Sequence, residues 1–175
     1  MIAFFGYGGV LLALASAVLL VSRGVRTARS PGEPRHRLVA PVRGMLVGAI
    51  LAMGALELAL LIDDFSIQYV AEHHARSTPL LFTIATAWAA LEGSIVLWGL
   101  VLAGFTAALL RRVEDGDGLG AGALAVMGLV AIFFFGLMAT VANPFGVLEV
   151  VPADGPGQYG EGEDGQQQVV EEEHS

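Results

Sequence analysis

Four long stretches of hydrophobic residues alternate with shorter polar segments along the chain. Each stretch carries at most one charged residue, Glu57 in the second and Glu92 in the third. A helix needs ~20 apolar residues to cross the hydrocarbon core of a bilayer, where it satisfies its own backbone hydrogen bonds. The pattern therefore predicts four membrane-spanning helices. They are expected at about residues 2–22, 44–62, 80–110 and 119–141.

The same stretches lack the polar face that a helix of a water-soluble bundle presents to solvent. Hydrophobic residues make up 55% of the chain, charged residues make up 15%, and the mean hydropathy is +0.67. An ordinary soluble domain has about 25% charged residues. Pattern and composition together favour the membrane over an aqueous four-helix bundle. We therefore expect an all-α, polytopic membrane protein, with residues 1–150 as a four-span membrane domain.

Arginines are concentrated in two of the three connections. The first connection contains six and the third contains Arg111 and Arg112, whereas the second contains only Arg76 against three acidic residues. Because cytoplasmic loops are enriched in arginine, we expect the first and third connections in the cytoplasm. The N-terminus, the second connection and the C-terminal tail are then expected outside. The arginines follow the first stretch instead of preceding it, which favours an uncleaved span over a signal peptide.

Residues 151–175 form a tail of different composition, rich in Gly, Gln, Glu and Asp. From residue 149 onward there are eight acidic residues and no basic one, whereas the rest of the chain balances nine acidic residues against nine arginines. Such a segment cannot bury enough apolar surface to offset the entropy lost on ordering, so we expect it to be disordered. Since the chain has no basic face, nucleic acid is not an expected partner.

The chain contains no cysteine, which excludes disulfide bonds, thiolate metal sites and covalent thiol chemistry. The adjacent His73 and His74 in the second connection could bind a metal or haem, but an adjacent pair lacks the spacing of a metal site. We expect them to be solvated loop residues. No catalytic residue and no metal ligand is assigned from the sequence.

Glu92 is the first candidate for chemistry. It follows Pro79 by 13 residues, which places it ~20 Å along a continuous third helix. An ionisable group at that depth usually faces a cavity or a partner. Glu92 could act as a proton relay or anchor a cofactor, although a hydrogen bond between helices that fixes packing is the favoured alternative. Glu57 lies nearer its helix end and is expected to reach the interface.

Two tryptophans and two small residues lie close to Glu92 in the sequence. Trp88 fits the aromatic belt at the membrane interface, whereas Trp98 is expected to lie deeper. Gly93 and Ser94 allow another helix to approach closely. Helix packing is therefore the expected role of this patch.

Three short motifs lie around the third and fourth stretches. The second connection contains an Asp-Phe-Ser-Ile-Gln-Tyr-Val sequence, the third stretch contains Trp-Ala-Ala-Leu-Glu-Gly-Ser followed by Leu-Trp, and Asn-Pro-Phe follows the fourth stretch. In order and spacing they resemble the CcmF/NrfE family, the haem lyase subunits of bacterial cytochrome c maturation. The motif residues that carry this resemblance are Asp64, Phe65, Tyr69, Trp88, Glu92, Gly93, Ser94, Trp98, Asn143, Pro144 and Phe145.

The resemblance implies a function for the complete protein. A member of this family would accept haem, its implied cofactor, from a haem chaperone outside the membrane and attach it to the thiols of apocytochrome c. The implied location is the bacterial inner membrane. The implied partners are membrane lipid, the remaining haem lyase spans or subunits, the haem chaperone and the proteins that handle apocytochrome c thiols.

The resemblance stops after residue 157, before the family's tryptophan-rich external loop and its haem-ligand histidines. This leads us to expect a truncated, frameshifted or split gene. Our first hypothesis is that the chain is the N-terminal membrane part of a haem lyase, with scaffolding residues. A small transport or channel subunit that uses Glu92 as a proton or cation site, and a non-functional fragment, are the alternatives. The sequence leaves open whether the chain is an enzyme.

Overall fold

The computed structural model describes residues 1–30 and 32–155, and every regular element in this part of the chain is a helix. Four of these helices are long and apolar enough to cross a membrane, which confirms the expected all-α chain with four spans. The long helices are α1 (Ile2–Arg29), α2 (His36–Leu61), α5 (Leu91–Leu110) and α6 (Gly118–Thr140), and the short ones are α3 (Gln68–His73) and α4 (Leu80–Thr86).

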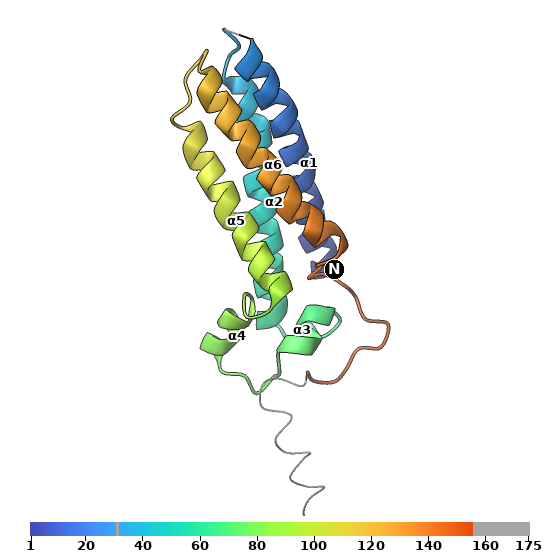
Figure 1. Cartoon of the computed structure of the whole chain (residues 1–175). Coiled ribbons are helices and arrows are strands. Elements are labelled where there is room, and N and C mark those ends of the chain that lie inside the picture. The colour runs from blue at the N-terminus through green and yellow to red at the C-terminus, as the bar shows by residue number, and fades with distance from the viewer. Residues whose placement is uncertain (31, 156–175) are drawn as a thin grey trace, which may run out of the picture.

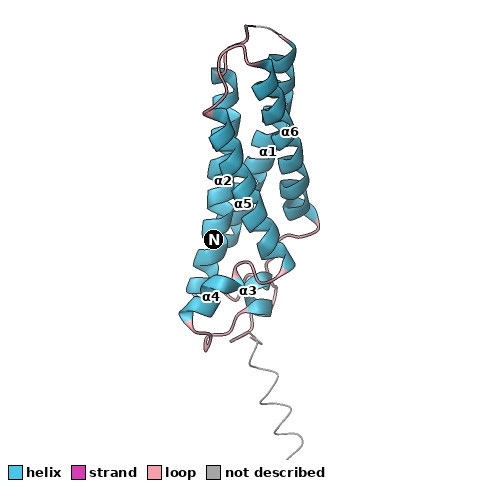
Figure 2. Ribbon diagram, turned by 60° about the vertical axis from the view of Figure 1, so that its left-hand side comes forward, coloured by secondary structure: helices cyan, strands magenta, loops and turns pink. Residues whose placement is uncertain are grey.

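The long helices form one antiparallel bundle (Figures 1 and 2). Helix α1 packs against α2 and α6, and α5 closes the ring by packing against the same two helices. The first and third connections meet at one end, which we call the arginine end (residues 23–43 and 111–117). Helices α3 and α4 lie at the opposite end, which we call the motif end (residues 62–94 and 141–155).

Small residues set the closest helix contact, between α1 and α2. A Cβ atom on Gly9 would lie 2.7 Å from the Gly48 carbonyl oxygen, so neither helix has room for a side chain there. In lipid, helix association depends on van der Waals packing because the hydrophobic effect between helices is absent, and small residues allow the backbones to approach. Gly44 and Gly48 lie four residues apart on α2, and both face α1, so they mark the place where the two helices cross.

The third expected span, residues 80–110, is divided in the structure. Helix α4 ends at Thr86 and α5 begins at Leu91, with a tight turn between them in which the Ala89 N–H donates to the Thr86 carbonyl at 3.1 Å. Figure 1 shows α4 beyond the end of the bundle, and α5 alone lies within it. No proline or glycine marks this break, which is why hydropathy alone predicts one long helix.

The expected tail begins at residue 151, and its first five residues belong to the described part of the chain. The Arg76 N–H donates to the Asp154 Oδ1 at 3.0 Å, and the Arg76 Nε donates to the Ala153 carbonyl at 3.2 Å. The start of the tail is thus held against the second connection. Residues 156–175, where disorder is expected, lie outside the described residues.

Candidate functional site

The motif residues come from three separate segments of the chain, and the fold brings these segments together at the motif end. The segment before α3 and the segment after α6 are paired directly. The Gln68 N–H donates to the Gly146 carbonyl at 2.8 Å, the Leu148 N–H donates to the Ser66 carbonyl at 3.0 Å, and an antiparallel bridge joins Ile67 to Val147. Motifs far apart in the sequence therefore form one structural unit.

Asp64 and Phe65 shape the turn from α2 into α3. The Asp64 N–H donates to the Ala59 carbonyl at 2.9 Å, and the Asp64 carboxylate accepts hydrogen bonds from the Ser66 hydroxyl and backbone N–H. Phe65 is buried and its ring stacks on the His74 imidazole, with ring centroids 6.2 Å apart. An aspartate whose carboxylate accepts hydrogen bonds within its own turn stabilises the local backbone conformation.

His74 is buried, so the expectation of a solvated loop histidine is wrong for this residue. Only 2% of its surface is exposed, and its Nε2 donates to the Asp63 Oδ1 at 2.8 Å. Its Nδ1 is buried without a hydrogen-bond partner among the described residues. The reason is that the second connection folds back over Phe65, which hydropathy does not reveal. His73 is half-buried, and its Nδ1 donates to the Tyr69 carbonyl at 3.0 Å.

Tyr69 links α3 to the turn between α4 and α5. Its buried hydroxyl donates to the Thr86 carbonyl at 2.7 Å. Burial raises the pKa of Tyr69 to about 12, with the nearby Glu92 carboxylate adding to the shift and a backbone hydrogen bond at Ala90 opposing it. The hydroxyl therefore stays protonated as a donor at any physiological pH.

Gly93 and Ser94 hold the same turn from the α5 side. A Cβ atom on Gly93 would collide with the Ala87 carbonyl oxygen and the Tyr69 hydroxyl, so only glycine fits. The Ser94 hydroxyl donates to the Trp88 carbonyl at 2.8 Å and closes the turn. These contacts give a structural reason for the Gly-Ser pair of the motif.

Glu92 lies in the first turn of α5, so its expected position ~20 Å along a continuous helix is wrong. The reason is the break after Thr86, which moves the start of the span from Leu80 to Leu91. A carboxylate in the first turn of a helix is stabilised by the helix dipole. Because Glu92 lies at the end of the span, its position no longer supports a role as an ionisable group in the middle of the membrane.

The Glu92 side chain lines a polar pocket of about 290 Å³ between α3, α5 and the segment after α6. Its neighbour Glu72 accepts a hydrogen bond from the Gln68 Nε2 at 2.7 Å. The other residues that line the pocket are Tyr69, Val141, Asn143 and Gly146.

The two tryptophans lie on the outside of the bundle. Trp88 is 41% exposed and Trp98 is 60% exposed. Trp98 follows Leu91 by seven residues, which is ~10 Å along α5, closer to the motif end than a helix from Leu80 would place it. Both rings are therefore free to contact lipid or further protein.

The Asn-Pro-Phe motif anchors the end of α6 to the start of α1. The Asn143 Oδ1 accepts a hydrogen bond from the Phe145 N–H at 3.0 Å, which turns the chain after the helix. Pro144 and Phe145 are both buried, and a Cβ atom on Gly6 of α1 would collide with the Phe145 ring. The motif thus holds the end of α6 against the start of α1.

The described residues contain no cluster of side chains suited to metal binding. No group of three or more His, Asp or Glu side chains among them could hold a metal ion. His74 is engaged by Asp63, His73 is bonded to Tyr69, and His36 lies at the opposite end of the bundle. Among the described histidines, the buried His74 has its Nε2 bonded to Asp63, so this nitrogen is not available to a haem iron.

Sequence reasoning missed the Asp63–His74 pair and the role of Arg76. Arg76 covers Phe65, with its guanidinium carbon 5.3 Å from the ring centroid, and it holds residues 153 and 154. Asp63 has a φ of +55°, in the left-handed region where aspartate is one of the tolerated residues. The feature of the sequence that could have indicated this turn and its contacts is the Asp63-Asp64 doublet at the end of a hydrophobic stretch.

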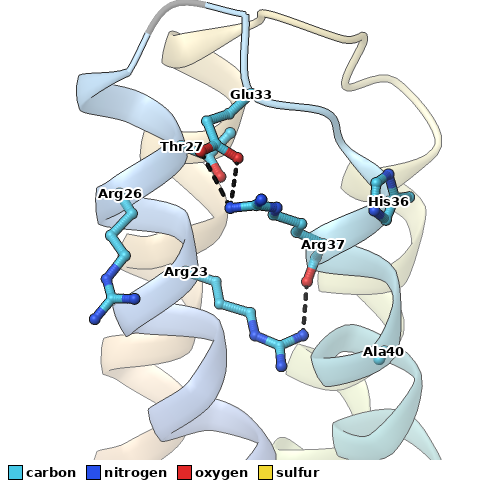
Figure 3. A pocket seen from close by; sticks show the side chains of 7 residues that line it. All are labelled: Arg23, Arg26, Thr27, Glu33, His36, Arg37 and Ala40. Atoms are coloured by element: carbon cyan, nitrogen blue, oxygen red, sulfur yellow. Dashed lines mark hydrogen bonds and ion pairs between the residues drawn. The ribbon is translucent and has the colours of Figure 1, made fainter.

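A second pocket, of about 480 Å³, lies between α1 and α2 at the arginine end (Figure 3). Three arginines and Glu33 line it; Arg37 forms an ion pair with Glu33 at 2.8 Å, and Arg23 donates to the Arg37 carbonyl at 3.0 Å. The second contact joins the end of α1 to the start of α2. Arg26 and His36 also line the pocket.

The chain is similar to known proteins of cytochrome c biogenesis, although no family model matches it. It is 36% identical to "Cytochrome c-type biogenesis protein CcmF" of Pseudomonas fluorescens, over 67% of this chain and 18% of that protein. It is 34% identical to "Cytochrome c-type biogenesis protein NrfE" of Haemophilus influenzae, over 60% of this chain and 17% of that protein.

A solved structure named "Cytochrome c Heme Lyase CcmF" has the same fold. It superimposes with a TM-score of 0.78 and 40% sequence identity, over 85% of this chain and 25% of that chain. The chain spans less than a quarter of the length of each of the two relatives named above. The resemblance seen in the motif residues is thus confirmed: the chain belongs, as one segment, to the CcmF/NrfE family of cytochrome c-type biogenesis proteins.

Proposed function

We propose that the chain is the N-terminal, four-span membrane part of a cytochrome c-type biogenesis protein, and that it takes part in haem transfer to apocytochrome c as a scaffold. Its four apolar helices and its relatives support a multi-pass protein of the inner membrane. The observation that carries the proposal is the shared fold with the solved haem lyase, at 40% identity over 85% of this chain.

The motif residues support a positioning role. Tyr69, Gly93 and Ser94 all fix the turn between α4 and α5, and Asn143 and Phe145 hold the end of α6 against the start of α1. Their polar groups are engaged by backbone atoms, which leaves them poorly placed to react with a substrate. We infer that the motif end is a rigid platform for the remaining spans and for the parts of the complete protein that handle haem.

The complete protein would receive haem from a haem chaperone and would meet apocytochrome c together with its thiol-handling proteins. We infer from the family resemblance that the haem ligands lie on the remaining spans or subunits. This chain contributes the helix surfaces against which the remaining spans or subunits pack.

We infer that the arginine end faces the cytoplasm and the motif end faces outside. Eight of the nine arginines lie at the arginine end, and Arg76 is the exception. This distribution follows the enrichment of arginine in cytoplasmic loops. The motif end would then lie on the side where apocytochrome c is matured.

Complementation tests the proposal. The full chain is expressed in a bacterium whose CcmF lacks the corresponding segment, and covalent haem on c-type cytochromes is measured by haem staining after denaturing electrophoresis. We expect the chain to restore staining. A Gly9→Leu chain should fail, because its side chain would meet the Gly48 carbonyl and part α1 from α2.

Two results would contradict the proposal. One is a stable, inserted chain that does not restore staining. The other is a purified chain that binds haem stoichiometrically through His73 or His74, seen as a Soret band that disappears on their substitution. Proton flux in liposomes that Glu92→Gln abolishes would instead support the transport alternative, and rapid loss of the chain in a pulse-chase experiment would support a non-functional fragment.

A further inference from the structure

A groove of about 250 Å³ runs between α2 and α5 at the arginine end. Apolar side chains line part of it, among them Val39 and Leu46 of α2 and Ala107 of α5. Arg35, Arg43 and Arg111 line the rest, and no acidic residue lines it. The groove therefore combines apolar side chains with three positive charges.

Arg43 on α2 and Arg111 after α5 lie at a similar depth relative to the membrane. Arg43 directly precedes the hydrophobic stretch that begins at residue 44, and Arg111 directly follows α5, which ends at Leu110. Because both residues stand where an apolar span meets a polar segment, they lie at the depth of the lipid headgroups. Arginine at a helix end extends its guanidinium toward that layer.

The charges of Arg43 and Arg111 are available. Both residues are exposed, and neither guanidinium forms a hydrogen bond or an ion pair within residues 1–30 and 32–155. Arg35 is partly engaged, because its guanidinium donates to the Val113 carbonyl at 3.0 Å. The neighbouring pocket of Figure 3 differs, since there Glu33 neutralises Arg37.

We propose that this groove binds an anionic phospholipid, with the lipid phosphate between Arg43 and Arg111 and an acyl chain along the apolar side chains. A guanidinium matches the geometry of a phosphate and can donate two parallel hydrogen bonds to it. Basic pockets between transmembrane helices are suited to anionic headgroups. The apolar side chains favour a phospholipid over a free phosphate ion, which would leave them uncovered.

The bound lipid would join two parts of the bundle. Helices α1 and α2 form one hairpin and α5 and α6 form another, and the groove lies where α2 meets α5. A phosphate held from both sides would bridge the two hairpins at the arginine end. Removal of the lipid should therefore loosen the contact between α2 and α5.

The test uses the purified full chain, stripped of lipid in a neutral detergent. Native mass spectrometry measures the binding of phosphatidylglycerol and, for comparison, phosphatidylcholine. Each arginine near the membrane surface is expected to strengthen binding about fivefold, so Arg43→Gln with Arg111→Gln should weaken phosphatidylglycerol binding about 25-fold. Arg43→Lys with Arg111→Lys keeps the charge and should retain most of the affinity.

Arg112→Gln is the matched control. Arg112 is exposed, follows Arg111 directly and does not line the groove. Phosphatidylglycerol binding should be unchanged in this variant, and the circular dichroism of all variants should match that of the parent chain. Ala107→Phe, which fills the apolar part, should weaken lipid binding while leaving both arginines in place.

Three outcomes would overturn the proposal. Equal losses in Arg112→Gln and in the double variant would mean a general attraction to negative charge. Equal binding of phosphatidylcholine, which has the same phosphate but a cationic choline group, would mean that the groove does not select lipids of net negative charge. Displacement of phosphatidylglycerol by inorganic phosphate at matching concentration would mean an anion site without a lipid.

Discussion

The substitution Gly93→Ala adds a single methyl group at a crowded point of the motif end. Its Cβ would collide with the Ala87 carbonyl oxygen, which belongs to the turn, and with the hydroxyl of Tyr69. Overpacking of this kind costs ~1–3 kcal/mol. If Tyr69 moves away instead, its hydrogen bond to the Thr86 carbonyl is lost, and a buried polar group without a partner costs a similar ~1–3 kcal/mol.

The higher helix propensity of alanine offsets only a small part of this destabilisation. Alanine favours a helix over glycine by ~1 kcal/mol in a helix interior, but Gly93 lies in the first turn of α5, where less is gained. We therefore expect Gly93→Ala to lower the free energy of unfolding by ~1–3 kcal/mol. Gly104→Ala is the matched control, because Gly104 lies on the same helix with open space around its Cα. That variant should be neutral or slightly stabilised.

Tryptophan fluorescence is a suitable assay, because Trp88 and Trp98 flank the substituted position and are the only two tryptophans of the chain. Equilibrium unfolding in mixed micelles, from a mild detergent to a denaturing one, gives the free energy for each variant. Equal stability of Gly93→Ala and Gly104→Ala would refute the reasoning, because it would show that the turn between α4 and α5 yields without cost.

Three further predictions concern the second connection. Tyr69→Phe should cost ~1 kcal/mol in the same unfolding assay. In the parent chain, the raised pKa of Tyr69 means that its stabilising contribution is complete below pH 10 and is lost as the pH rises toward about 12. Ultraviolet titration should therefore show an absorbance change near pH 12 that is absent from Tyr69→Phe. Asp63→Ala should destabilise the chain more than Asp63→Asn, because alanine loses the hydrogen bond from His74 and disfavours the left-handed backbone, whereas asparagine keeps an acceptor oxygen and tolerates that backbone. Equal losses in the unfolding assay would contradict this. The backbone hydrogen bond from Arg76 holds the pKa of Asp154 below its usual 3.8. The hydrogen bond between Arg76 and Asp154, which fixes the start of the tail, should therefore be present above that pH and lost as the pH falls below it. Hydrogen exchange at residues 153–155 that does not change with pH would rule this out.

The four spans could be predicted because hydropathy alone determines them. The break between α4 and α5 could not, since residues 80–110 are uniformly apolar and the turn depends on contacts made by Tyr69 and Ser94 from outside it. The predicted depth of Glu92 failed for the same reason. A hydropathy pattern shows which residues are excluded from water. It does not show that the hydroxyl groups of Tyr69 and Ser94 bond to backbone carbonyls of the turn where the helix is interrupted.

The motif residues were a better guide to the site than any single residue. Their order in the sequence indicated a common function, and the structure shows that Asp64, Gly93 and Phe145 each fix a turn or a helix contact at the same end. The burial of His74 escaped prediction, because a histidine in a polar connection gives no sign of the aromatic ring that covers it. Phe65 supplies that ring from nine positions earlier in the chain.

The pairing of Ile67 with Val147 sets an order of assembly. These residues are 80 positions apart, and a ribosome adds roughly 5–20 residues per second, so the second connection waits ~4–16 s for the segment with which it pairs. During that time α1 and α2 can already pack, whereas the segment before α3 has unpaired backbone groups. The motif end is therefore the last part of the bundle to be completed, and a nascent chain that stalls before α6 exposes that segment to membrane proteases.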